Sequence, residues 1–108
     1  MLERLNRDDR LLLLKFVCAF AWADDVVEEG ERRFVRRIMG KLALSADEVN
    51  DVESWLLVPP PPEELDPAKI PVEYRQVFLG AVRAVLFADG NVSPEEEAKL
   101  AALQRALG

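Results

Sequence analysis

The spacing of apolar residues predicts five helices and no strand. Apolar positions recur every three or four residues along most of the chain, which is the period of a helix packed on one side. No segment alternates apolar and polar residues, and the chain contains no Thr. We therefore expect an all-α fold, a single compact helical domain over residues 1–108. The expected helices cover about 8–23, 28–42, 45–56, 71–88 and 94–107.

The first expected helix differs from the others because its apolar residues cover nearly the whole circumference. In the run LLLLKFVCAFAWA, Lys15 is the one charged residue. A helix that is apolar on all sides is buried in a globular protein, so we expect it to be the central helix. Asp8 or Asp9 is expected to begin it, since either carboxylate can accept hydrogen bonds from the free amides of the first turn. Trp22 and Trp55 fall on apolar faces, which favours core anchors over ligand platforms.

Local signals mark where helices begin and where two of them are expected to approach. Ser45 with Glu48, and Ser93 with Glu96, have the spacing of capping boxes, in which each side chain covers a backbone amide of the first turn. Gly80 lies in the middle of the fourth expected helix, where Gly costs about 1 kcal/mol relative to Ala. We therefore expect another helix to approach closely at Gly80.

Residues 58–70 form the one segment with loop composition. Pro59 to Pro62 must break the third helix, because proline lacks the amide that continues it. Four successive prolines favour an extended left-handed strand that could dock in an aromatic groove. No PxxP spacing with flanking basic residues is present, so we favour a stiff connector between the two halves of the domain.

One pattern occurs on both sides of this connector. The first copy is residues 20–35, FAWADDVVEEGERRFV, and the second is residues 85–100, VLFADGNVSPEEEAKL. At an offset of 65 residues, Ala23 matches Ala88, Asp24 matches Asp89, Val27 matches Val92, Glu31 matches Glu96 and Val35 matches Leu100. Helical periodicity alone would not align the acidic positions as well as the apolar ones. We therefore expect two similar halves, about 8–44 and about 71–108, packed about a pseudo-twofold axis.

Missing residue types exclude several kinds of chemistry. The chain has no His and one Cys, which excludes an internal disulfide, a Cys/His zinc site and a His acid or base. Any bound metal must then be a hard cation held by oxygen. Cys18 lies in the apolar run, which favours a core-filling role over a nucleophile.

Charge also limits the partners. The net charge of −6 argues against nucleic acid. Four arginines lie between residues 32 and 37, but Glu28 and Glu29 precede two of them by four residues. This order favours ion pairs along one helix, so we interpret the arginines as a solvated, self-paired face rather than a phosphate-binding patch.

The N-terminal apolar run superficially resembles a signal peptide. Ala21 and Ala23 imitate a cleavage site, but Lys15 interrupts the run, and acidic residues balance the arginines that precede it. Its 13 residues fall short of the ~20 that a spanning helix needs. We expect a cytoplasmic protein with no direct membrane insertion.

Each copy of the repeat places an Asp at the end of one helix and a Glu in the first turn of the next. Packing about a pseudo-twofold axis would bring Asp24, Glu31, Asp89 and Glu96 together, and their repulsion would need a cation to offset it. We interpret these four carboxylates as a candidate oxygen-only site for Ca²⁺, Mg²⁺ or Mn²⁺. Helix capping is the alternative and the one we favour, because Glu96 can close a box with Ser93 and acids near helix starts are favoured by the dipole.

The repeated pattern, an apolar helix followed by Ala-Asp-Gly-x-Val/Ile and x-x-x-Glu, resembles the TerB-like domain of bacterial tellurite-resistance proteins. The resemblance covers most of the chain, from about Leu11 to Leu107. It implies an all-helical fold with internal pseudo-symmetry, a bacterial cytoplasmic setting, links to tellurite and other stress, and a metal site at the four acidic positions. This chain departs from the family pattern at Asp25, which replaces Gly, and in its proline run.

Three functions follow from these observations. The first is a non-enzymatic interaction or scaffold module of TerB type, with a protein partner of unknown identity and a divalent cation at the clustered carboxylates. The second is a metal-dependent hydrolase, since four carboxylates could carry two metals. The third is a structural oligomerisation domain, such as a homodimer, that uses Trp22 or Trp55 at its interface.

Overall fold

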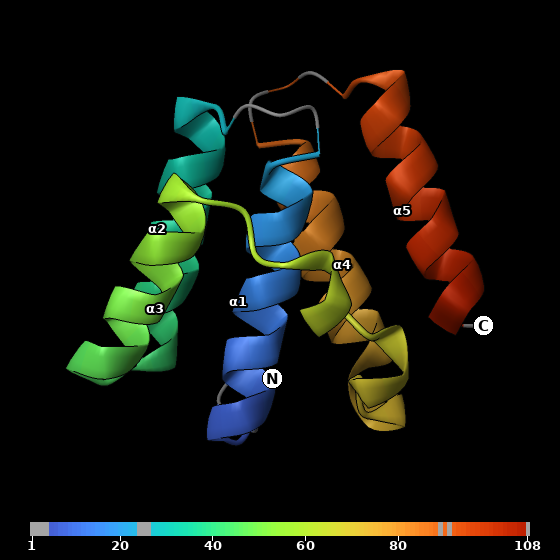
Figure 1. Cartoon of the computed structure of the whole chain (residues 1–108). Coiled ribbons are helices and arrows are strands. Elements are labelled where there is room, and N and C mark those ends of the chain that lie inside the picture. Colours follow the sequence, from blue (N-terminus) through green and yellow to red (C-terminus); the bar gives the residue numbers. More distant parts are fainter. Residues whose placement is uncertain (1–4, 24–26, 89, 91, 108) are drawn as a thin grey trace.

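The first helix, α1 (Arg7–Ala21), lies at the centre of the molecule (Figure 1). The computed structural model describes residues 5–23, 27–88, 90 and 92–107. α1 contacts α2, α3 and α4, and Leu13, Leu14 and Val17 along it have no exposed surface. The prediction of a central, buried helix is therefore confirmed.

The ends of α1 differ slightly from those expected. Asn6 is the N-cap, and its side-chain oxygen accepts a hydrogen bond of 2.8 Å from the Asp9 amide. Asn caps a helix as well as Asp does, so the helix begins one residue before the two aspartates. Both aspartates then lie in the first turn, where the helix dipole favours negative charge. The helix ends at Ala21, two residues before the expected end.

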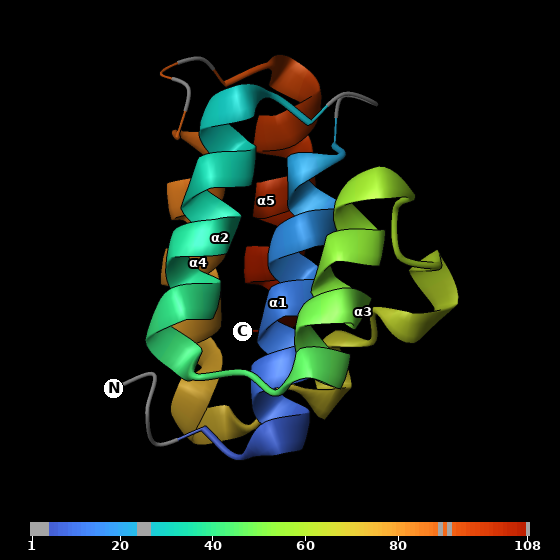
Figure 2. The same ribbon diagram turned by 90° about the vertical axis from the view of Figure 1, so that its left-hand side faces the viewer.

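Two helices, α2 (Glu29–Leu42) and α3 (Ala46–Leu57), lie beside α1 on one side of the molecule (Figure 2). Both agree with the predicted ranges to within one residue. α2 ends at Ala43, which adopts a left-handed conformation with φ of 52°. α3 begins with the predicted capping box, in which the Ser45 amide donates to Glu48 at 2.8 Å and the Glu48 amide donates to the Ser45 hydroxyl at 3.3 Å.

The arginines of α2 pair both within the helix and across to α3. Arg33 lies 3.5 Å from Glu29, as the spacing predicted. Arg36 instead reaches Glu53 of α3, with its two guanidinium nitrogens 3.3 and 3.1 Å from the carboxylate. This bidentate pair raises the pKa of Arg36 and ties α2 to α3.

Two single-residue predictions had opposite outcomes. Cys18 is fully buried, and burial raises the pKa of its thiol to about 12, so the prediction of a core-filling cysteine is confirmed. The expectation at Gly80 is wrong. A Cβ placed there would meet no atom within 4 Å, so no neighbouring helix needs the missing side chain.

The connector between the halves crosses the face of the molecule in front of α1 (Figure 1). It contains two short 3₁₀ helices, η2 (Pro62–Glu64) and η3 (Pro67–Lys69). Ile70 anchors its far end in the core, where it is 3% exposed. A third short helix, η4 (Val72–Tyr74), leads into α4.

The last two helices are α4 (Arg75–Leu86) and α5 (Pro94–Leu107). α4 is shorter than the predicted 71–88, because its first turn is the 3₁₀ helix η4 and it ends two residues early. α5 begins with the second predicted capping box, in which the Ser93 amide donates to Glu96 at 2.8 Å and the Glu96 amide donates to the Ser93 hydroxyl at 3.1 Å.

The described residues form a compact, all-helical body without strands, so the all-α prediction is confirmed. The radius of gyration of 12.7 Å is close to the roughly 13 Å expected for a folded chain of this length. A single cluster of buried apolar side chains includes residues of all five α-helices. Within the described ranges, every helix is too short or too polar to cross a membrane.

Candidate functional site

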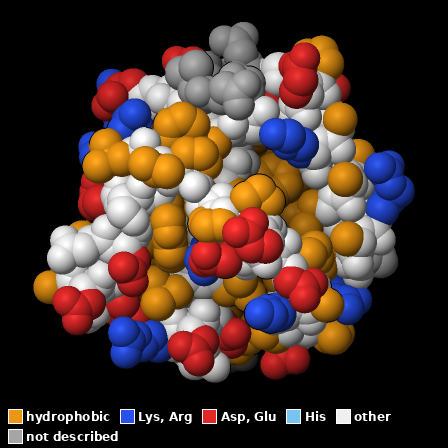
Figure 3. Space-filling model, in the orientation of Figure 1, with side chains coloured by type: hydrophobic (Ala, Val, Ile, Leu, Met, Phe, Trp, Pro, Cys, Tyr) orange, Lys and Arg blue, Asp and Glu red, His pale blue; other side chains and the backbone are white. Residues whose placement is uncertain are grey.

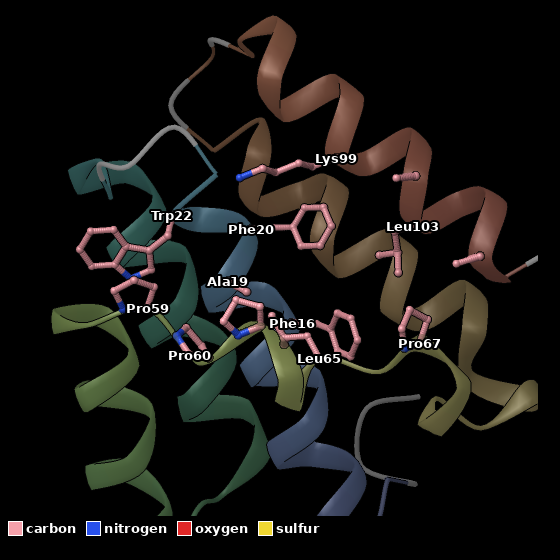
Figure 4. A pocket seen from close by; sticks show the side chains of 13 residues that line it. Phe16, Ala19, Phe20, Trp22, Pro59, Pro60, Leu65, Pro67, Lys99 and Leu103 are labelled. Carbon is pink, nitrogen blue, oxygen red and sulfur yellow. The ribbon is translucent and has the colours of Figure 1, made fainter.

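An apolar groove lies between α1, the connector and α5 (Figure 4). Its volume is about 600 Å³, within the range of small-molecule sites. On the face drawn in Figure 3, hydrophobic side chains gather in the hollow between the connector and α5. The residues that line it are Phe16, Ala19, Phe20, Trp22, Pro59, Pro60, Pro62, Leu65, Pro67, Lys99, Ala102, Leu103 and Ala106.

Two helices form facing walls of the groove because of where their side chains repeat. Phe16, Ala19 and Phe20 are spaced three and four residues apart, so they share one face of α1. On α5, Ala102 and Ala106 share a face by the same rule, and both are exposed. Alanine cannot fill the space between two helices, which is why this side of α1 stays open.

The connector forms the third wall. Its prolines have fixed torsions and no amide donor, so they present a rigid surface of mainly apolar ring atoms. Lys15 of α1 holds the connector in place by an ion pair of 2.8 Å with Glu64. Only one fifth of the Lys15 side chain is exposed, so its ammonium is better shielded from solvent than the guanidinium groups of the surface ion pairs. The prediction of a stiff connector did not foresee that this segment also forms one wall of the groove.

Trp22 lies at one end of the groove, beside Pro59 (Figure 4). Its indole Nε1 donates a hydrogen bond of 2.7 Å to the Trp55 carbonyl of α3. Lys15 Nζ lies 5.3 Å from the centre of the Trp55 ring, within the range of a cation–π contact. Both tryptophans pack against the core, as predicted, but Trp22 also lines the groove. Trp22 is therefore both a core residue and a groove residue, two roles that the prediction from sequence treated as alternatives.

Among the described residues of the lining, Lys99 is the one charged side chain. It reaches from α5 across the groove toward the end of α1 (Figure 4), and its Nζ donates to the Ala23 carbonyl at 3.0 Å. An ammonium has three donors, so this bond leaves capacity for an anionic group. The groove therefore combines one cationic end with walls whose described side chains are otherwise apolar, apart from the Trp22 indole N–H, which is already bonded.

The predicted metal ligands divide into two groups. Asp24 and Asp89 lie outside the described residues. Glu31 and Glu96 are described and buried, 1% and 3% exposed, and each accepts a bond of 2.8 Å from the backbone amide three residues earlier. The first turns of α2 and α5 lie at the same end of the molecule (Figures 1 and 2). Among the described residues, no group of three or more Asp, Glu, Cys or His side chains is placed to hold a metal.

Glu48 shows what capping alone does to a glutamate. It lies outside the repeated pattern, yet it is 3% exposed and accepts the same 2.8 Å bond, from Ser45. Its other oxygen lies 3.2 Å from Arg7 Nε. Chiefly because of the Ser45 amide, and further because of Arg7, the pKa of Glu48 lies below its ordinary value. A buried glutamate at a helix start is therefore expected here without any metal.

Sequence reasoning did not find the groove. The apolar circumference of α1 was a usable signal, because a helix with neighbours on only part of its surface leaves apolar residues uncovered. The alanine spacing on α5 was a second signal. Neither signal shows where the connector passes, and the path of the connector decides whether the space between α1 and α5 is filled.

Comparisons of the chain with family models, with curated proteins and with solved structures gave no match.

Proposed function

We propose that this chain is a non-enzymatic binding module and that its binding surface is the groove between α1, the connector and α5. The observation that carries the proposal is the groove itself, about 600 Å³ of apolar space bounded by three separate segments. Large concave apolar sites on small proteins usually take a ligand or partner, because uncovered apolar surface is unfavourable in water.

The chemistry of the lining supports binding rather than catalysis. Enzyme sites normally bring together a nucleophile, an acid or base, and groups that stabilise developing charge. Within the part of the lining that the structure describes, Lys99 is the one ionisable group, and its ammonium already donates to a backbone carbonyl. The hydrolase alternative draws no support from the groove.

A neutral fluorescent probe tests the proposal. N-phenyl-1-naphthylamine should bind with one-to-one stoichiometry and show increased emission. Ala102→Trp places a large ring at an exposed lining position and should weaken binding at least tenfold. Ala98→Trp is the matched control, because Ala98 is exposed on the same helix and does not line the groove. Equal binding by both variants, or no binding by the wild type, would refute the proposal.

A TerB-like relationship, with its internal repeat and its links to tellurite and other stress, remains part of the proposal. It is supported by the two copies of the acidic turn and by the matching roles of Glu31 and Glu96, which both lie buried at the third position of a helix. The same geometry at Glu48 shows that this likeness does not require a shared metal site.

Divalent-cation binding at Asp24, Glu31, Asp89 and Glu96 remains a prediction. Isothermal titration of Ca²⁺, Mg²⁺ and Mn²⁺ into chelator-treated protein tests it directly. If a site exists, Glu31→Gln and Glu96→Gln should each abolish the heat, and Glu48→Gln should not. Absence of heat for the wild type at about 1 mM of each cation would remove the hypothesis.

A further inference from the structure

The groove has a charged group at one end and apolar walls elsewhere, and this distribution limits the kinds of ligand that it can bind. Twelve of the thirteen described residues that line it are apolar, and the thirteenth, Lys99, lies at one end. Trp22 could offer an indole donor, but that donor is occupied by the Trp55 carbonyl at 2.7 Å. A ligand in the groove therefore finds one cation and almost no other hydrogen-bonding side chain.

This chemistry excludes most polar metabolites. Sugars, nucleotides and free amino acids carry several donors and acceptors, and each one buried without a partner costs roughly 1–3 kcal/mol. A long alkyl chain needs no polar partner along its length. A carboxylate at its end could accept from the free donors of the Lys99 ammonium.

Building on the proposed function, we infer that the groove binds a long-chain carboxylate, such as a fatty acid. The alkyl chain lies along Phe16, Phe20 and Leu103, and the carboxylate meets Lys99 near the end of α1. Among the residues that the structure describes, no Asp or Glu lines the groove, so no described anion opposes this orientation.

Chain length and head group supply the direct test. Octanoate, decanoate and laurate should bind with affinities that increase about fourfold for each added methylene, the gain expected for burying one CH₂. Dodecanol has the same chain as laurate without the charge, and it should bind about three- to tenfold more weakly. Isothermal titration below the micelle concentration measures all four.

Two side chains test the orientation. Lys99→Met keeps the stem of the side chain, removes its charge and should lower laurate affinity about three- to tenfold while leaving dodecanol unchanged. Lys41→Met is the matched control, since Lys41 is an exposed lysine on α2 outside this groove. Ala102→Trp should weaken both ligands, and Ala98→Trp neither.

The results separate the two proposals. If the neutral probe binds in the groove but laurate binds no better than dodecanol, the carboxylate inference is wrong and the binding module stands. The inference also fails if an amphipathic helical peptide displaces the probe and laurate does not, because the occupant is then a protein segment. If Ala102→Trp weakens neither the probe nor laurate, both proposals fail.

Discussion

α3 and α5 begin in the same way and pack differently. Each opens with a Ser-x-x-Glu capping box whose amide-to-carboxylate bond is 2.8 Å long. α3 packs directly against α1, whereas α5 contacts mainly α4 and η3 and leaves a groove on its α1 side. Capping depends on four consecutive residues, but packing depends on which segment lies between two helices. Here that segment is the connector, so α1 has a sealed side against α3 and an open side toward α5.

Removing a large side chain from each side should produce the largest difference. Leu14 is fully buried, and Leu14→Ala should lower the free energy of unfolding by about 2–5 kcal/mol. Phe20 is partly buried at the groove, so Phe20→Ala should cost about 1–2 kcal/mol, since less apolar surface loses its contacts. Urea unfolding measures both values. An equal cost would mean that the open side contributes to the core as much as the sealed side does.

The same two variants should have the reverse order in probe binding. Phe20→Ala removes a groove wall and should weaken N-phenyl-1-naphthylamine, whereas folded Leu14→Ala should bind it like the wild type.

Removing either helix cap should lower the free energy of unfolding by a similar amount, but different helices should lose protection from hydrogen exchange. Ser45→Ala and Ser93→Ala should each destabilise their helix by about 1 kcal/mol. Because α5 packs mainly against α4 and η3 rather than against the central helix α1, Ser93→Ala should speed amide hydrogen exchange in α5 and leave α1 protected. Ser45→Ala should instead lower protection in α1 as well, because α3 covers α1. Uniform loss of protection in both variants would show that α5 folds as one unit with the rest.

The left-handed end of α2 offers a gain in stability on the sealed side. Ala43 has φ of 52°, a conformation that costs an L-residue roughly 1 kcal/mol and that Gly adopts freely. Ala43→Gly should therefore raise the free energy of unfolding by about 0.5–1 kcal/mol and leave groove binding unchanged. Ala98→Gly, within exposed α5, is the control and should lower it by about 1 kcal/mol. A loss in both variants would contradict the assigned conformation.

The smallest expected effect concerns the dependence of the unfolding free energy on pH. The pKa of Glu48 is lowered from its ordinary value of 4.5, so its contribution to stability is full above about pH 4.5 and is lost as the pH falls toward the folded-state pKa. Glu48→Gln has no carboxylate at this position and therefore lacks this pH-dependent contribution to stability. Its unfolding free energy should therefore fall less steeply than that of the wild type between about pH 5 and pH 3. Parallel curves would show that Glu48 is not held as a carboxylate.

Local signals in the sequence predicted most of the helices. The two Ser-x-x-Glu boxes located the starts of α3 and α5, and the apolar circumference of α1 gave its central place. These predictions succeeded because each depends on residues that are close together in the chain. The exact start of α1 was missed because Asn6, one residue before the helix, competes with the two aspartates as the cap.

Predictions that depended on tertiary contacts were weaker. Gly80 was expected to allow a close helix approach, but nothing in the spacing of α4 reveals how far its neighbour lies. The groove needs α1, the connector and α5 in one place, and their lining residues are separated by up to 90 positions, from Phe16 to Ala106. The proposed carboxylate cluster depends on Asp24 and Asp89, which lie outside the described residues, so it stays a prediction.

The two bonds that secure α5 have a consequence for selectivity. Near its start, Lys99 donates to the Ala23 carbonyl at 3.0 Å, and at its end the Leu107 carbonyl accepts from Arg75 at 2.7 Å. A helix that is bonded to its neighbours at two points resists sideways displacement. The width of the groove beside α1 is therefore set before a ligand binds. Ligands are then selected by whether they fit this preset width.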